Sequence, residues 1–184
     1  MSEFVISTRY ANALMESSLE KNSFEQVMKD IELVYNTLNS SKELRNVLEN
    51  PIIPSEKKNK ILEEIFSNKI SDEVKSFISL IVNKKRENIL LEICNRFLQL
   101  CDEKLNRIKV EITSAVELNN EQKNNIVKKL EEITNKKVIA SYNLDNTIIG
   151  GFKARFNDTV VDASVKHQLE LLKKKLFEED YLSN

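Results

Sequence analysis

Apolar residues recur at intervals of three and four along the first 105 residues, and this spacing predicts a succession of α-helices. The first helix is expected from about Val5 to Glu20 and the last from about Glu87 to Leu105. The second helix has the clearest apolar face, formed by Phe24, Val27, Met28, Ile31, Val34, Tyr35 and Leu38. Six such segments with short links predict a helical bundle.

Serine residues precede several of these segments, at positions from which a hydroxyl can accept a hydrogen bond from a free N–H of the first turn. Where a Glu or Gln follows three residues later, a capping box is expected. The expected caps are Ser23 with Gln26, Ser40 with Glu43, Ser55 and Ser71. Pro51 and Pro54 end the third helix, because the residue before a proline is disfavoured in helical conformation.

The period changes near residue 106. Residues 108–113 alternate apolar with polar side chains, as a half-buried strand does, and further strands are expected at 138–144, 152–156 and 159–161. Asn119 and Gln122 have capping-box spacing before a helix that separates the first two strands. A last helix carries Val165, Leu169, Leu172 and Leu176. The predicted fold is α+β and mostly α, with a six-helix bundle over 1–105 and a small α/β domain over 106–184.

Composition agrees with a helical, core-forming chain. Of its 184 residues, 41% are apolar and 31% charged, and only two glycines and two prolines interrupt the pattern. The 28 basic and 29 acidic residues balance, which argues against a dedicated nucleic-acid binder. Cys94 and Cys101 lie two helical turns apart, too far to form a disulfide with each other, so they are expected to be small core residues.

Residues that carry catalysis are scarce. His167 is the only histidine, no Cys and His set has zinc spacing, and no phosphate-binding glycine loop is present. Gly150 and Gly151 precede a strand, so they are interpreted as a turn that needs positive φ. Asp162 or Ser164 is expected to cap the last helix. No catalytic residue, cofactor or metal is therefore expected, and an unfamiliar enzyme is the weakest alternative.

Two groups of lysines could bind anionic lipid or nucleic acid: Lys57-Lys58-Lys60 and Lys173-Lys174-Lys175. Both groups are interleaved with or flanked by glutamates. The favoured interpretation is therefore a solvated, mixed-charge helix face.

The first and fifth helices have wider apolar faces than one core contact requires. The first helix confines its polar residues to a narrow arc, and part of the remaining arc consists of the small residues Ala11, Ala13, Ser17 and Ser18. The fifth helix extends its apolar face with Leu80 and Val82. Either the bundle buries both helices on two sides, or a groove between them accepts a partner helix.

Motifs throughout the chain resemble, in the same order, those of the delta subunit family of F-type ATP synthases, which includes the mitochondrial oligomycin-sensitivity-conferring protein. The strongest is Ile148-Ile149-Gly150-Gly151-Phe152 followed by Val160-Val161-Asp162-x-Ser164-Val165-Lys166-x-x-Leu169. The others are Arg9-Tyr10-Ala11-x-Ala13-Leu14, Asn50-Pro51-x-x-Pro54, Phe77 to Leu90 with Arg86, and Val116-x-Leu118-x-x-Glu121-Gln122. Ala163, where relatives often have glycine, is a departure.

This resemblance implies a non-catalytic stator subunit. In the family, the N-terminal domain binds the N-terminal helices of the alpha subunits through its first and fifth helices. The C-terminal domain holds the b subunits of the peripheral stalk, which keeps the catalytic head from turning with the rotor. The implied protein is a monomer in isolation, lies at the cytoplasmic face of the cell membrane, and meets the membrane only through its complex.

The residues expected to line the partner-helix groove are Tyr10, Ala13, Leu14, Ser17, Phe77, Leu80, Ile81 and Lys84. On the stalk side, the expected surface is the C-terminal helix with the sheet edge near Phe152. A generic cytoplasmic helical adaptor is the alternative function, because it would keep the groove without any role in ATP synthesis.

Overall fold

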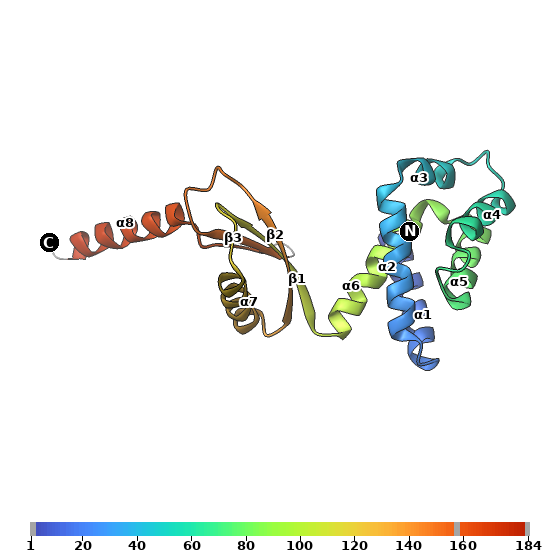
Figure 1. The fold of residues 1–184 in the computed structure, drawn as a ribbon, viewed down its shortest axis with the longest axis horizontal. Coiled ribbons are helices and arrows are strands. Elements are labelled where there is room, and N and C mark those ends of the chain that lie inside the picture. Colours follow the sequence, from blue (N-terminus) through green and yellow to red (C-terminus); the bar gives the residue numbers. More distant parts are fainter. Residues whose placement is uncertain (1–2, 157–158, 183–184) are drawn as a thin grey trace. The chain divides into compact units, whose positions relative to one another are not determined.

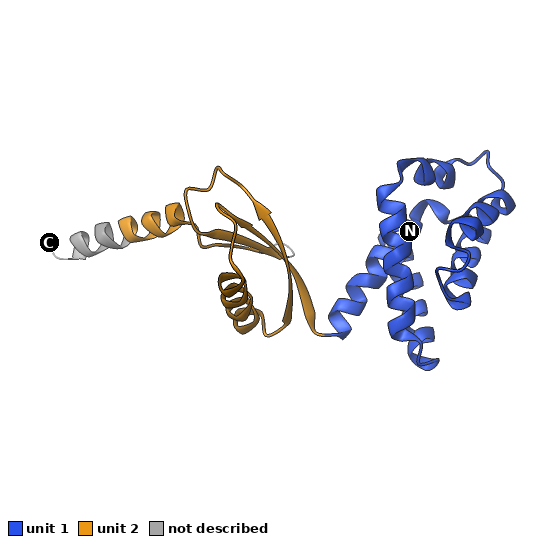
Figure 2. Ribbon diagram, in the orientation of Figure 1, with its two compact units in different colours: residues 1–105 blue, residues 106–184 orange. Residues whose placement is uncertain are grey.

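The chain divides into two compact units, Met1–Leu105 and Asn106–Asn184 (Figure 2). In the structure, a computed structural model, backbone is described for residues 3–156 and 159–182, and side chains for residues 3–156 and 159–174. The first unit is helical and the second contains a four-stranded sheet, which confirms the predicted fold class (Figure 1).

Within residues 3–105, the first unit contains six α-helices and one short 3₁₀ helix, close to the expected positions (Figure 1). Its elements are α1 (Glu3–Glu20), α2 (Phe24–Ser40), α3 (Lys42–Glu49), α4 (Ser55–Phe66), α5 (Asp72–Asn83), η1 (Glu87–Ile89) and α6 (Leu90–Lys104). Helix α6 packs against both α1 and α2. Its Leu90, Ile93, Phe97 and Cys101 are fully buried, so this helix supplies much of the apolar core.

The helix starts differ in detail from the serine pattern. Ser41, not Ser40, precedes α3 and accepts a hydrogen bond from the N–H of Leu44, while Ser40 is the last residue of α2. Ser55 is the first residue of α4 and Pro54 stands before it, because the proline ring already holds extended backbone there. The predicted caps at Ser40 and Ser55 are therefore wrong by one residue.

Two other serines have the predicted position without the predicted bond. Ser23 precedes α2, but its side chain does not cap it and instead donates to the Glu73 carboxylate at 2.7 Å. The N–H of Ser71, before α5, donates to the buried carboxylate of Asp30 at 2.7 Å. In both cases the serine before the helix is bonded to a carboxylate that is distant in sequence.

The burial of one lysine in α4 also differs from the expectation. Lys57 and Lys60 are exposed, but Lys58 is only 2% exposed and lies within the bundle. Its ammonium group is paired with Glu87, whereas the favoured interpretation placed the whole group on a solvated face. That interpretation is wrong for Lys58, because a sequence pattern does not show that a distant carboxylate can compensate for burial.

The second unit is built on a mixed sheet with strand order β2-β1-β3-β4. Strands β1 and β2 are parallel and connected through α7, whereas β3 is antiparallel to both of its neighbours. The elements are β1 (Arg107–Ser114), α7 (Asn120–Thr134), β2 (Lys137–Leu144), β3 (Phe152–Phe156), β4 (Thr159–Asp162) and α8 (Val165–Leu182).

Alternation along the strands separates the two faces of this sheet. Ile108, Val110 and Ile112 of β1 point to one face, where Ile126 and Leu130 of α7 complete a small core. The opposite face carries polar residues of the same strands, among them Lys109, Glu111, Lys153 and Arg155. The start of α7 has the predicted capping box, because the side chains of Asn119 and Gln122 each accept a hydrogen bond from the other residue's N–H.

Candidate functional site

Helices α1 and α5 run antiparallel with a hollow between them. Ser17 and Lys21, at the end of α1 and just after it, donate hydrogen bonds to Glu73 in the first turn of α5. Tyr10, two turns earlier in α1, is bonded to Arg86, which follows α5. These contacts hold the two helices together at both ends of the hollow, which is termed here the α1–α5 groove.

The groove has a volume of about 640 Å³ and is apolar along its middle. Leu14 is nearly buried and closes its base, while Leu80 is 46% exposed on the opposite wall. The small side chains of Ala13 and Ser17 allow another backbone to come close. The lining residues are Tyr10, Ala13, Leu14, Ser17, Lys21, Asp72, Glu73, Ser76, Phe77 and Leu80.

A cluster of hydrogen bonds closes one end of the groove. The carboxylate of Glu73 accepts bonds from the hydroxyl of Ser17 at 2.9 Å, the hydroxyl of Ser23 at 2.7 Å and the ammonium of Lys21 at 3.2 Å. Burial by itself raises the pKa of Glu73, but hydrogen bonds from Ser23, Ser17 and Lys21 together lower that pKa below its ordinary value. Glu73 is therefore ionised at neutral pH and ties the start of α5 to the end of α1.

An arginine closes the other end. The guanidinium of Arg86 donates to the Tyr10 hydroxyl at 2.9 Å and lies 5.4 Å from the centre of the Tyr10 ring. This combination of a hydrogen bond and a cation–π contact fixes the orientation of a side chain that lines the groove.

Six of the eight residues expected at the groove line it: Tyr10, Ala13, Leu14, Ser17, Phe77 and Leu80. Ile81 is fully buried in the bundle core and does not line the groove. Lys84 lies just after α5 and lines a neighbouring hollow on the α4 side, which shares Ser76 and Leu80 with the groove.

Lys21, Asp72, Glu73 and Ser76 were not among the expected lining residues. Counting back from Leu80 by four and by seven reaches Ser76 and Glu73, so helical spacing already places these two on the same face. The expected residues of α5 lie in its C-terminal half and just after it, from Phe77 to Lys84. They therefore do not include the polar residues at the N-terminal end of α5.

The residues assigned to a turn and a cap gather at the start of α8. Gly151 has a φ of +80°, and an added Cβ would lie 2.4 Å from the carbonyl oxygen of Ala163. Ser164 accepts a hydrogen bond from the N–H of His167, and Asp162 accepts one from the N–H of Ser164. Hydrogen bonds from Ser164 and from Lys153 lower the pKa of Asp162 to about 2. Gly150 has no positive φ, but an added Cβ would touch Val165 at 3.0 Å.

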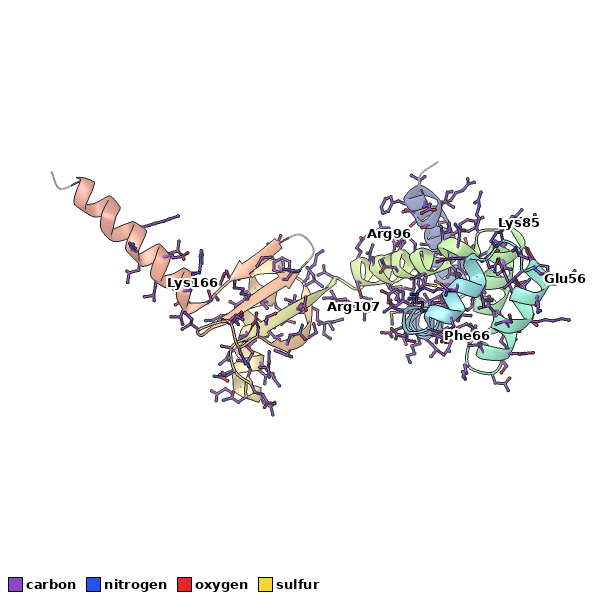
Figure 3. All side chains as sticks on the ribbon, turned by 90° about the horizontal axis from the view of Figure 1, so that it is seen from above. Glu56, Phe66, Lys85, Arg96, Arg107 and Lys166 are labelled. Atoms are coloured by element: carbon purple, nitrogen blue, oxygen red, sulfur yellow. The ribbon has the colours of Figure 1, made fainter. Side chains whose placement is uncertain are left out.

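Helix α8 carries a second group of exposed apolar residues. Val165, Leu169 and Leu172 follow one another at spacings of four and three, and Leu169 is 61% exposed. In Figure 1 the helix extends away from the sheet, and Figure 3 shows the side chains near Lys166 projecting outward. Leu176, expected on the same face, and Lys175 have side chains outside the described residues.

Phe152, which was expected near an edge of the sheet, lies on an inner strand. Phe152 begins β3, which lies between β1 and β4, and its side chain packs partly against the α7 core. The edge strands are β2 and β4. Strand order depends on long-range pairing, which local alternation does not reveal.

The described residues show no arrangement typical of a metal or membrane site. Within residues 3–156 and 159–174, no three His, Cys, Asp or Glu side chains gather in a way that could hold a metal ion. Cys94 and Cys101 are buried and form no disulfide, and burial raises the pKa of the Cys94 thiol to about 12. No helix in the described part of the chain is both long and apolar enough to cross a membrane.

Comparison with known proteins identifies the family. The model of the ATP synthase delta (OSCP) subunit family matches residues 6–176. The ATP synthase subunit delta of Chlorobaculum tepidum is 39% identical over 176 residues, which cover 96% of this chain and 97% of that protein. The subunit delta of Chlorobaculum parvum is 38% identical over 179 residues, covering 97% and 99%.

A solved structure shows the same fold. A chain of the cryo-EM structure of the Toxoplasma gondii mitochondrial ATP synthase hexamer superimposes with a TM-score of 0.69 at 21% identity, over 93% of this chain and 97% of that chain. Together with the family match, the full-length relatives decide against the generic adaptor. The chain belongs to the ATP synthase delta (OSCP) subunit family, and it is a non-catalytic stator subunit that serves ATP synthesis and proton transport.

Proposed function

We propose that this subunit joins the catalytic head of the ATP synthase to the peripheral stalk through two separate surfaces. The α1–α5 groove binds the N-terminal helix of an alpha subunit, and the second unit holds the b subunits. The observation that carries this proposal is an apolar hollow of about 640 Å³ between two antiparallel helices, with polar contacts at both ends.

The groove suits an amphipathic helix. Leu14, Phe77 and Leu80 offer apolar contact area, and Ala13 and Ser17 leave room for the partner's backbone. Burying apolar area stabilises a complex by roughly 25 cal/mol per Å² before the cost of association is subtracted. A stator joint must resist torque without dissociating, and such a contact can supply the necessary affinity.

The stalk-side contact involves α8. Its Val165, Leu169 and Leu172 form an apolar row of the kind that packs against another helix, and the described residues of its own unit leave them exposed. The b subunits are the family's partner at this domain, so we assign this row to them.

Titration calorimetry tests the groove. The full chain is titrated with a synthetic peptide of the N-terminal segment of the alpha subunit from the same organism. We expect a dissociation constant below about 1 μM, which corresponds to about −8 kcal/mol. Ala13→Glu places a charge in the apolar groove and should weaken binding about a hundredfold.

Asn12→Glu is the matched control, because it adds the same charge to the adjacent, exposed position outside the groove. It should bind like the unaltered chain. If the folded protein does not bind the peptide, or if both variants bind equally well, the groove is not the alpha-subunit site.

A further inference from the structure

The bundle contains a buried ion pair that does not touch the groove. Lys58 of α4 is 2% exposed, and its ammonium donates to the Glu87 carboxylate at 2.5 Å and to the carbonyl oxygen of Leu48 at 2.6 Å. The pair therefore connects the end of α3, the first turn of α4 and the start of η1.

Such a pair contributes little to folding when compared with apolar residues of the same size. Removing two charges from water costs about as much free energy as their attraction returns, so replacing both partners by apolar residues is often neutral or stabilising. A buried pair of this kind is better explained by the geometry that it imposes, and the geometry here is that of the turn between α5 and η1.

That turn is tightly constrained. After α5, the N–H of Lys85 donates to the Val82 carbonyl at 2.9 Å and the N–H of Arg86 to the Ile81 carbonyl at 3.1 Å. Lys85, labelled in Figure 3, has a φ of +55°, a conformation usually left to glycine at the end of a helix. Glu87 lies two residues after Lys85, at the start of η1, so its bond to Lys58 fixes the position of the chain at the end of this turn.

The same turn reaches the groove through Arg86. This arginine, adjacent to Glu87, holds the hydroxyl and ring of Tyr10, which lines the groove. A continuous series of contacts therefore runs from Lys58 through Glu87 and Arg86 to Tyr10, although Lys58 does not line the groove itself.

We infer that the Lys58–Glu87 pair is a positioning device for the Tyr10 end of the α1–α5 groove. It determines the affinity for the partner helix through Arg86 and without contact to that helix. This inference rests on the proposed function, because it assigns a positioning role for the same groove.

The test separates stability from binding. In the full chain, Lys58→Met combined with Glu87→Leu removes both charges and keeps similar side-chain volumes. We expect a folded variant with a thermal midpoint close to that of the unaltered chain, because loss of the donor to the Leu48 carbonyl offsets the gain from removing the two charges. Binding of the alpha-subunit peptide should be about tenfold weaker. Lys57→Met is the matched control, since it alters the exposed neighbouring lysine of α4 and should leave both quantities unchanged.

A double-mutant cycle tests the route. Tyr10→Phe removes the hydroxyl that Arg86 holds. If the pair acts through Arg86, the effects of Tyr10→Phe and of the double substitution on peptide affinity are not additive. Additive effects would place the pair outside this route and overturn the inference.

The other outcomes are equally decisive. Full-strength binding by the folded double variant would overturn the inference and leave the proposed function intact. Loss of the helical circular dichroism signal in the double variant would assign the pair to stability and also overturn the inference. Absence of binding by the unaltered chain would instead remove the proposed function, and the inference with it.

Discussion

The two units differ in what the polar groups at the starts of their helices are bonded to. In the first unit, the polar groups at the starts of α2 and α5 are bonded to Glu73 and Asp30, residues about 50 and 41 positions away in sequence. In the second unit, α7 and α8 are capped by Asn119 and Ser164, which lie immediately before them. The residues at the starts of α2 and α5 therefore bond to partners that tertiary packing brings close, whereas α7 and α8, like α3 of the bundle, are capped by the residue immediately before them.

The two units also differ in which apolar residues they leave exposed. The bundle encloses its apolar residues between several helices and presents the α1–α5 groove on its outside. The sheet unit covers one face of its sheet with α7 and leaves the apolar row of α8 exposed. The comparison teaches that the first unit offers a preformed groove for a partner, whereas the second offers an exposed apolar row on the described part of α8.

The largest effect should come from the bundle core. Phe97→Ala removes a fully buried ring from α6 and should reduce the free energy of unfolding of the first unit by about 3–5 kcal/mol. Native-state hydrogen exchange would show the loss in the helices of the bundle and leave the sheet unit protected. Phe4→Ala, at a 58% exposed position, should cost less than about 1 kcal/mol. Equal loss of protection in both units would contradict the expectation that the loss is confined to the bundle.

A glycine exchange should destabilise the second unit selectively. Gly151→Ala forces a side chain into positive φ and against the Ala163 carbonyl, so we expect a loss of about 2 kcal/mol or more. Gly150→Ala is the paired control, because its Cβ would meet only the Val165 side chain. Hydrogen exchange of the amides in β3, β4 and α8 measures the destabilisation in both variants. A larger loss of stability in Gly150→Ala than in Gly151→Ala would contradict this prediction.

The local cap of α7 should contribute a moderate amount. Asn119→Ala removes one side of the capping box and should cost about 1 kcal/mol, with faster amide exchange in the first turn of α7. Asn124→Ala, at an exposed position inside the same helix, should be neutral or slightly stabilising, because alanine is the better helix former. If both substitutions destabilised α7 equally, the cap would have no special role.

The smallest expected effect is the pH dependence of the stabilisation that the Glu73 carboxylate gives the bundle. Because the pKa of Glu73 is lower in the folded chain than its ordinary value of 4.5, its carboxylate stabilises the fold above that pH. This stabilisation is lost as the pH falls below 4.5 and through the lower, folded-state pKa. The difference in unfolding free energy between the unaltered chain and Glu73→Gln should therefore shrink on acidification, as urea titrations at several pH values would show. A constant difference would show that the charge of Glu73 contributes nothing.

Much of this fold was predictable because the period of apolar residues is a local property. Residues 24–38 show the spacing of α2, and residues 108–113 show the alternation of β1. The Asn119–Gln122 box was predictable for the same reason. Ser23 has the same spacing to Gln26, but Glu73 takes its hydroxyl, and no local pattern reveals a competitor fifty residues away.

Six of the groove residues could be selected from the sequence, because a helical wheel shows which faces of α1 and α5 are apolar. The wheel does not show which neighbour covers each face. Ile81 therefore belongs to the core and Glu73 to the groove, although both lie on α5.

The sequence by itself determined the kind and order of the elements, the change from bundle to sheet near residue 106, and the family, since each depends on spacing and residue identity along the chain. Only the tertiary structure decided that Lys58 is buried, that Glu73 and Arg86 close the two ends of the groove, and that Phe152 lies on an inner strand. The physical reason is that burial and pairing depend on residues brought together from distant parts of the chain.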